Sequence, residues 1–97
     1  MALPARVQQD LRRLAMKYHV RRIVLFGSRA RGTNRPKSDI DLAVWGCSDF
    51  GEFSCAVEEE VWTLLKFDLV DMDQPYISDE LRENIRREGV EIYAEMG

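Results

Sequence analysis

Two aspartates, Asp39 and Asp41, stand at the start of a segment in which hydrophobic and other residues alternate. Over residues 39–45 this alternation predicts a β-strand, whose successive side chains leave opposite faces. Both carboxylates therefore leave one face, about 6.6 Å apart along a backbone that rises ~3.3 Å per residue. Two carboxylates this close repel each other unless a cation lies between them, and Mg²⁺ with water and phosphate oxygens suits such a pair. The alternative is the polar outer face of an edge strand, against which Ala43 and Trp45 on the same face argue.

A glycine-serine pair, Gly27-Ser28, follows the apolar run over residues 22–26. A buried strand that leads through such a pair into a helical turn presents backbone N–H groups and the positive end of a helix together, which favours phosphate binding. Gly27 permits close approach of a phosphate, and the Ser28 hydroxyl can donate a further hydrogen bond. The Walker A pattern and the Gly-x-Ser-x-Gly pattern of a hydrolase nucleophile are both absent. Taken alone, the pair is also compatible with an ordinary turn.

Further charged residues lie where they can complete such a site. Asp68, near the start of a third predicted strand over residues 67–72, is the favoured third carboxylate, as a proton acceptor or a second metal ligand. Asp71 and Asp73 are rivals, and Asp71 leaves the opposite face of the strand from Asp68. Four basic residues between the two motifs can steady bound phosphate or can be solvated loop charges, and the first two are the favoured ligands: Arg29, Arg31, Arg35 and Lys37.

The remaining pattern supplies the elements that must hold these residues. Apolar residues at helical spacing predict a first helix with a face formed by Leu3, Val7, Leu11, Leu14 and Tyr18. Asp49 and Glu52 resemble a capping pair, and they open a helix with an apolar face of Phe50, Phe53, Val57, Val61, Leu64 and Leu65. Ser78 predicts the N-cap of a last helix, which Gly89 ends before a closing strand over residues 90–94. This order predicts an α/β (α+β) fold, with helices packed on a small mixed β-sheet.

The bulk composition narrows the class of protein. A length of 97 residues and a hydrophobic fraction of 45% predict one domain over residues 1–97. No apolar run approaches the about 18 residues that span a bilayer, and the N-terminus lacks a signal-peptide core, so a cytoplasmic location without membrane attachment is expected. Cys47 and Cys55 lack metal-type spacing and are expected as reduced thiols.

The charge of the chain is distributed unevenly along it. Residues 1–38 carry ten Lys or Arg and one acidic residue, whereas residues 39–97 carry four Lys or Arg and sixteen acidic residues. This asymmetry indicates a basic region for a polyanion next to an acidic region for a cation, with two merely solvated faces as the alternative. The net charge of −3 argues against nucleic acid as a direct partner.

The glycine-serine pair and the two aspartates together resemble the signature of the DNA polymerase β-like nucleotidyltransferase superfamily. Ten residues separate Gly27-Ser28 from Asp39-Ile40-Asp41, and the surrounding Phe-Gly-Ser-Arg-Ala-Arg-Gly and Ser-Asp-Ile-Asp-Leu are similar to its minimal nucleotidyltransferase (MNT) branch. Residues 67–71 and 88–93 are also similar to that branch, so the resemblance covers nearly the whole chain. It implies that the pair contacts the triphosphate, that Asp39 and Asp41 bind magnesium, and that Asp68 is the third acid.

The resemblance also implies a reaction and a partner. The reaction is a magnesium-dependent transfer of a nucleotide, AMP from ATP, to an acceptor oxygen, although no residue selects the base. In the MNT branch the acceptor is a tyrosine of a HEPN-type helical toxin, which the MNT protein modifies as the antitoxin. Since the sequence leaves no room for the helical acceptor-binding domain of larger relatives, such a separate partner is expected.

Two other functions stay open, as does a homo-oligomer. The chain can be a non-catalytic module that neutralises a partner by contact, or a small-molecule transferase of the antibiotic-modifying kind. Aromatic residues often anchor interfaces, so five are candidates for a partner surface: Trp45, Phe50, Phe53, Trp62 and Tyr76. For Phe50 and Phe53 a position in the core is favoured, which leaves Trp62 as the better candidate.

Overall fold

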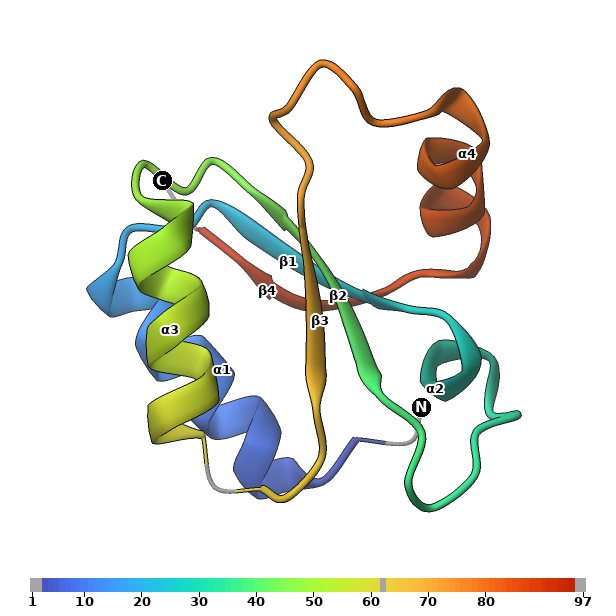
Figure 1. Cartoon of the computed structure of the whole chain (residues 1–97), viewed down its shortest axis with the longest axis horizontal. Helices are drawn as coiled ribbons and strands as arrows, with labels where there is room; N and C mark the ends of the chain where they lie inside the picture. The colour runs from blue at the N-terminus through green and yellow to red at the C-terminus, as the bar shows by residue number, and fades with distance from the viewer. Residues whose placement is uncertain (1–2, 62, 96–97) are drawn as a thin grey trace.

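The computed structural model describes residues 3–61 and 63–95. Its helices and strands follow one another as α1 (Ala5–Lys17), β1 (Arg22–Phe26), α2 (Ser28–Arg31), β2 (Ile40–Trp45), α3 (Phe50–Glu60), β3 (Phe67–Asp71), α4 (Asp79–Glu88) and β4 (Val90–Ala94). The strands form one mixed sheet in the order β3-β2-β1-β4, in which only the β2–β3 pair is parallel. Helices α1 and α3 lie on one side of this sheet, and α2 and α4 lie on the other (Figure 1). The predicted α/β fold with a small mixed sheet is confirmed.

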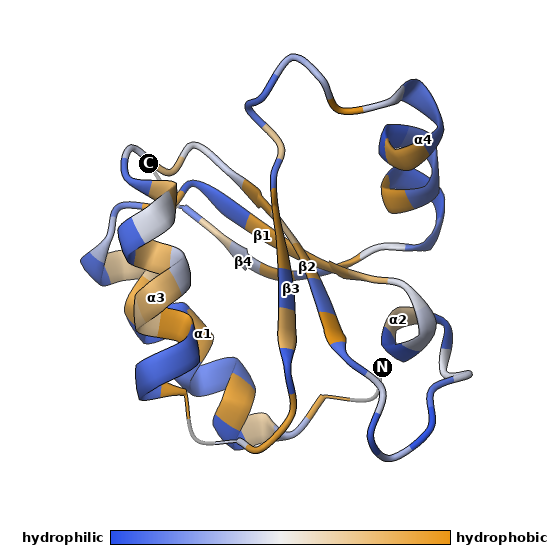
Figure 2. Cartoon of the chain, in the orientation of Figure 1, coloured by the Kyte–Doolittle hydropathy of each residue, from blue (hydrophilic) through white to orange (hydrophobic). Residues whose placement is uncertain are grey.

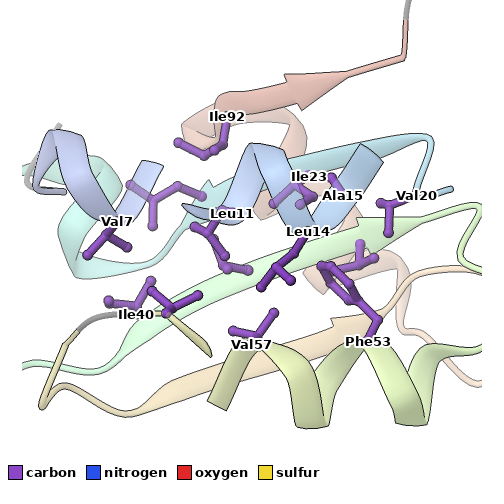
Figure 3. Packing of buried hydrophobic residues seen from close by; sticks show 14 of the residues in the cluster. Val7, Leu11, Leu14, Ala15, Val20, Ile23, Ile40, Phe53, Val57 and Ile92 are labelled. Carbon is purple, nitrogen blue, oxygen red and sulfur yellow. The ribbon is translucent and has the colours of Figure 1, made fainter. Parts of the chain in front are cut away.

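The side of the sheet under α1 and α3 holds the larger hydrophobic core. Apolar residues from both helices meet the inward side chains of the strands (Figure 3), and the most deeply buried include Val7, Leu11, Leu14, Ile23, Leu25, Ile40, Leu42, Phe53 and Val57. Burying each such side chain stabilises the fold by about 1.5–3 kcal/mol. Tyr18 adds an edge-on contact to Phe53, with the ring centroids 6.1 Å apart. This packing on the side of α1 and α3 fixes the positions of β1 and β2.

The other side of the sheet holds a smaller apolar cluster and leaves part of the surface uncovered. Here α4 packs on β1, and its Ile85 joins Val24, Ala43 and Met72, with Trp45 at the margin. The predicted two faces of β2 are therefore confirmed, since its alternate residues Ile40, Leu42 and Val44 belong to the larger core. The loop that joins α2 to β2 is mostly hydrophilic (Figure 2).

The predicted helix starts are confirmed, whereas one helix end differs from the prediction. Asp49 accepts a hydrogen bond from the Glu52 N–H at the start of α3, and Ser78 accepts one from the Leu81 N–H at the start of α4. The prediction that Leu64 and Leu65 continue the apolar face of α3 is wrong, because the helix ends at Glu60 and the backbone is extended at Val61. Without a further helical turn Leu64 is fully exposed, and Leu65 reaches the edge of the core from the loop.

Two further findings concern the helices and the cysteines. Every helix within residues 3–61 and 63–95 is too short or too polar to cross a membrane. Cys47 and Cys55 are free thiols, as predicted.

Candidate active site

Gly27 and Asp41 lie against each other where β1 ends and β2 begins. The antiparallel register pairs Phe26 with Asp41, so the glycine that follows Phe26 lies beside this aspartate. A β-carbon on Gly27 would overlap the Asp41 Oδ2 atom and come within 3.2 Å of the Asp41 Cγ atom. The φ of Gly27 is +75°, a backbone conformation that residues with a side chain rarely adopt. Glycine is therefore required twice here, by the turn and by the carboxylate.

The third carboxylate at this place is that of Asp68. In the parallel register of β2 and β3, Asp41 is the partner of Asp68, so both side chains leave the same face of the sheet. Asp71 is three residues further along and has Val44 as its partner. The Asp71 carboxylate instead accepts hydrogen bonds from the Asp73 N–H at 3.1 Å and the Gln74 side-chain amide at 2.9 Å. Asp71 thus shapes the turn after β3.

Asp73, the other rival, also lies at the far end of the strands. Its carboxylate accepts a hydrogen bond of 2.7 Å from the Gly46 N–H, just beyond the end of β2. Of the three candidates for the third carboxylate, Asp68 therefore lies beside Asp41. Asp71 and Asp73 instead accept hydrogen bonds in the turns at the other end of the strands.

The carboxylates form a cluster of like charge around Asp41. Burial raises the pKa of the Asp41 carboxyl above its ordinary value of 3.8, and the negative charges of Asp68 and Asp39 raise it further. Arg31 acts in the opposite direction and lowers this pKa. Asp39 and Asp68 are exposed, whereas Asp41 is half-buried. A cation bound at this cluster would offset the repulsion among the three carboxylates.

The donor atoms of the cluster suit Mg²⁺, which prefers carboxylate oxygens. Across residues 3–61 and 63–95, no group of three or more His, Cys, Asp or Glu side chains is drawn together tightly enough to hold a metal ion by itself. Mg²⁺ does not need such a cage, because it keeps several waters and takes one or two carboxylates together with substrate phosphate oxygens. The residues therefore fit Mg²⁺ that is bound jointly with a nucleotide.

Arg29, a predicted phosphate ligand, is buried and faces the loop that leads to Asp39. Its guanidinium donates hydrogen bonds to the backbone carbonyl oxygens of Ser38, at 3.0 Å, and Pro36, at 3.2 Å. It is the one buried charged residue in the described ranges, with 5% of its surface exposed. These contacts tie α2 to the residues just before β2, so Arg29 helps to set the spacing between the Gly27 turn and the aspartates.

Arg31, the second predicted ligand, acts on the Asp41 carboxylate through its charge. Its backbone N–H donates to the Gly27 carbonyl at 3.2 Å, which closes the turn of α2, and its side chain is half-exposed. The guanidinium forms an ion pair of 3.0 Å with Glu88 at the end of α4. The sequence analysis missed Glu88, although residues 88–93 were among those that resemble the MNT branch. Arg35 and Lys37 are exposed in the loop.

The five aromatic candidates for a partner surface fall into different environments. Phe53 is fully buried and Phe50 packs against the same core, as favoured from the sequence. Trp45 lies under the Arg22 guanidinium, 4.8 Å from the ring centroid. Tyr76 is 78% exposed in the segment between β3 and α4. Trp62 lies outside the described residues.

The fold and this site define a class of protein. A glycine-serine turn after one strand, set against aspartates on the next two strands of a mixed sheet, is the arrangement that the resemblance to nucleotidyltransferases implied. The family model described as polymerase beta, nucleotidyltransferase matches residues 9–96, and the chain belongs to this family.

Solved structures share the fold at low sequence identity. A crystal structure of a toxin–antitoxin with AMP-PNP superposes with a TM-score of 0.69 at 23% identity, over 92% of this chain and 74% of that chain. A tri-AMPylated Shewanella oneidensis HEPN toxin in complex with MNT antitoxin gives a TM-score of 0.61 at 20% identity, over 92% of this chain and 71% of that chain. No curated protein sequence matches the chain.

Proposed function

We propose that this chain is a magnesium-dependent nucleotidyltransferase that moves AMP from ATP to a hydroxyl group of a HEPN-type partner protein, and so acts as the antitoxin of a toxin–antitoxin pair. The observation that carries the proposal is the contact of Gly27 with the Asp41 carboxylate, with Asp68 beside it in register. This contact supports the proposal, because the turn that we propose to bind phosphate lies next to the carboxylates that we propose to bind the cation.

The Gly27–Ser28 turn and the aspartate carboxylates would bind the triphosphate group of the nucleotide between them. The space that a side chain on Gly27 would fill is occupied by the Asp41 carboxylate, and the N–H and hydroxyl of Ser28, the next residue, would donate hydrogen bonds to phosphate oxygens. A phosphate held there lies next to the half-buried Asp41 carboxylate, and the two negative groups need a cation between them. Mg²⁺ held by Asp39 and Asp41 would supply this positive charge and would neutralise the phosphate oxygens during transfer.

The transfer step uses the exposed position of Asp68. An acceptor hydroxyl that approaches the open edge of the sheet can give its proton to the Asp68 carboxylate. Its oxygen then forms a bond to the α-phosphorus, the bond from that phosphorus to the bridging oxygen breaks, and pyrophosphate leaves. Asp68 is thus the proton acceptor, or with Asp41 a ligand of a second ion.

The similar structures support the choice of nucleotide and partner. One of them contains AMP-PNP, an analogue of ATP, and another is a complex of an MNT antitoxin with a HEPN toxin that is tri-AMPylated. Both chains have the fold of this one, which supports a nucleotide and an acceptor protein of the same kinds for this chain.

The test is transfer of label from α-labelled ATP, in the presence of Mg²⁺, to a purified HEPN-type toxin. The wild-type chain should label that protein, and Asp39→Ala or Asp41→Ala should reduce labelling by about 10²–10³-fold. Asp79→Asn, which alters an aspartate in the first turn of α4, is the matched control and should label normally.

Other outcomes would point to the alternative functions. Persistent labelling by both site variants would place the chemistry elsewhere. Neutralisation of the toxin by Asp41→Ala without labelling would show inhibition by contact alone. Transfer to an aminoglycoside without any protein partner would show a small-molecule transferase.

A further inference from the structure

The Glu88-Gly89 pair at the end of α4 is far from the active-site motifs in the sequence but not in space. The Gly89 N–H donates to the Ile85 carbonyl at 2.8 Å, and a β-carbon on Gly89 would overlap both that carbonyl oxygen and the Val24 side chain on β1. Val90 then pairs with Leu25 as the first residues of the β1–β4 ladder at this end. The end of α4 is therefore pressed against β1, which fixes the position of Glu88.

From this position Glu88 reaches Arg31 of α2, which lies on the same side of the sheet as α4 (Figure 1). The Glu88 Oε2 atom lies 3.0 Å from the Arg31 guanidinium, and the Oε1 atom lies 3.9 Å from that of Arg87. The Glu88 side chain is 27% exposed and that of Arg31 is 46% exposed. The carboxylate is thus the more enclosed partner and the guanidinium the one with a free side toward solvent.

Arg31 connects this ion pair to the candidate active site. It is the last residue of α2, the turn that begins at Ser28, and its N–H donates to the Gly27 carbonyl. Its positive charge acts on Asp41 and partly offsets the repulsion from Asp39 and Asp68. The charge of Arg31 thus acts on the active-site cluster, and its guanidinium is held directly by Glu88.

We propose that Glu88 is a positioning residue. It holds the Arg31 guanidinium beside the Gly27–Ser28 turn, so that the guanidinium binds the triphosphate of an incoming nucleotide. This inference rests on the proposed function, because it assumes a nucleotide at that turn. A flexible arginine loses side-chain entropy when it binds a phosphate, and an ion pair that already restrains it reduces that loss. Glu88 itself does not touch the nucleotide.

The test is direct binding of AMP-PNP with Mg²⁺, measured by calorimetry without any acceptor protein. Glu88→Gln should weaken binding by about twofold to fivefold, the range of a partly exposed ion pair. Arg31→Gln should weaken it at least as much, and the double variant should bind no more weakly than Arg31→Gln alone, since Glu88 acts only through Arg31. Glu83→Gln is the matched control on the same helix, because Glu83 is ion-paired with Arg86 and not with the site, and it should bind like the wild type.

A charge swap separates positioning from a purely structural ion pair. Arg31→Glu with Glu88→Arg should restore the melting temperature lost in either single variant but not the affinity for AMP-PNP, since a glutamate at position 31 repels the phosphates. Wild-type affinity in Glu88→Gln, an additive loss in the double variant, or restored affinity in the swap would each overturn the assignment. If the wild type itself fails to bind AMP-PNP, the proposed function falls instead.

Discussion

The two sides of the sheet differ in composition, although the same strands form both: one side carries the larger apolar core and the other carries the candidate active site. On the side of α1 and α3, β2 presents Ile40, Leu42 and Val44 to a fully apolar core. On the opposite side the same strand presents Asp41 next to Gly27, and the covering elements are the short α2 and α4, both of which contact β1. Stability is concentrated on the first side, so the second side can keep three repelling carboxylates without losing the fold.

The largest effect is expected on the packed side. Phe53→Ala should lower the free energy of unfolding by about 3–5 kcal/mol, because it removes a fully buried ring from the larger core. Equilibrium unfolding in urea measures this loss, and Phe50→Ala, which truncates a half-buried ring on the same helix, should cost less. Equal losses in the two variants would contradict the prediction that the fully buried ring contributes more than the half-buried one to the core under α1 and α3.

Two arginines in α2 sharpen the comparison, because they are two residues apart and face different surroundings. Arg29→Met should lower the free energy of unfolding by about 1–3 kcal/mol, since it leaves the Ser38 and Pro36 carbonyl oxygens without this charged donor. Arg31→Met should cost about 1 kcal/mol or less, because its ion pair is partly exposed. Urea unfolding of both variants tests the difference, and a greater loss in Arg31→Met would reverse the two roles.

The smallest effect on stability is expected on the side of α2 and α4, which carries Asp41. Here a substitution should stabilise the protein. The pKa of Asp41 in the folded protein lies above its ordinary value of 3.8, so ionisation of this carboxyl costs free energy in the folded state. The cost is absent below the unfolded-state pKa, grows as the pH rises toward the folded-state pKa, and is fully present above it. Without Mg²⁺, Asp41→Asn should therefore melt at a higher temperature than the wild type at neutral pH.

The pH dependence of this gain provides its control. The difference in melting temperature between Asp41→Asn and the wild type should shrink as the pH is lowered toward 3.8 and vanish below it, where the Asp41 carboxyl is neutral in both the folded and the unfolded state. A variant that is less stable than the wild type at neutral pH would show that the Asp41 carboxylate is not under repulsion.

The comparison also explains which features the sequence could reveal. The alternation in β2 predicted both faces of the strand, because a period of two is a local property. The capping residues Asp49 and Ser78 predicted their helix starts for the same reason. The predicted end of α3 was wrong. The apolar spacing continues through Leu64 in the sequence, whereas the chain leaves the helix after Glu60 to enter β3.

The site was predictable only in part, since its contacts join distant segments. The opposite parity of Asp68 and Asp71 already favoured Asp68, but the parallel register beside Asp41 depends on how β3 docks on β2. The hydrogen bonds of Arg29 to the loop and the ion pair of Arg31 with Glu88 depend on tertiary packing, and the local sequence carries no signal that separates these two arginines.

The central claim is that the Gly27 turn and the Asp41 carboxylate together bind a nucleotide with Mg²⁺. Calorimetric titration with AMP-PNP tests it most directly, with and without Mg²⁺, in the wild type and in Gly27→Ala, Asp41→Asn and Asp71→Asn. Magnesium-dependent binding should occur in the wild type and in Asp71→Asn, and should be lost in Gly27→Ala and Asp41→Asn. Equal binding in all four proteins, or loss of binding in Asp71→Asn alone, would contradict the account.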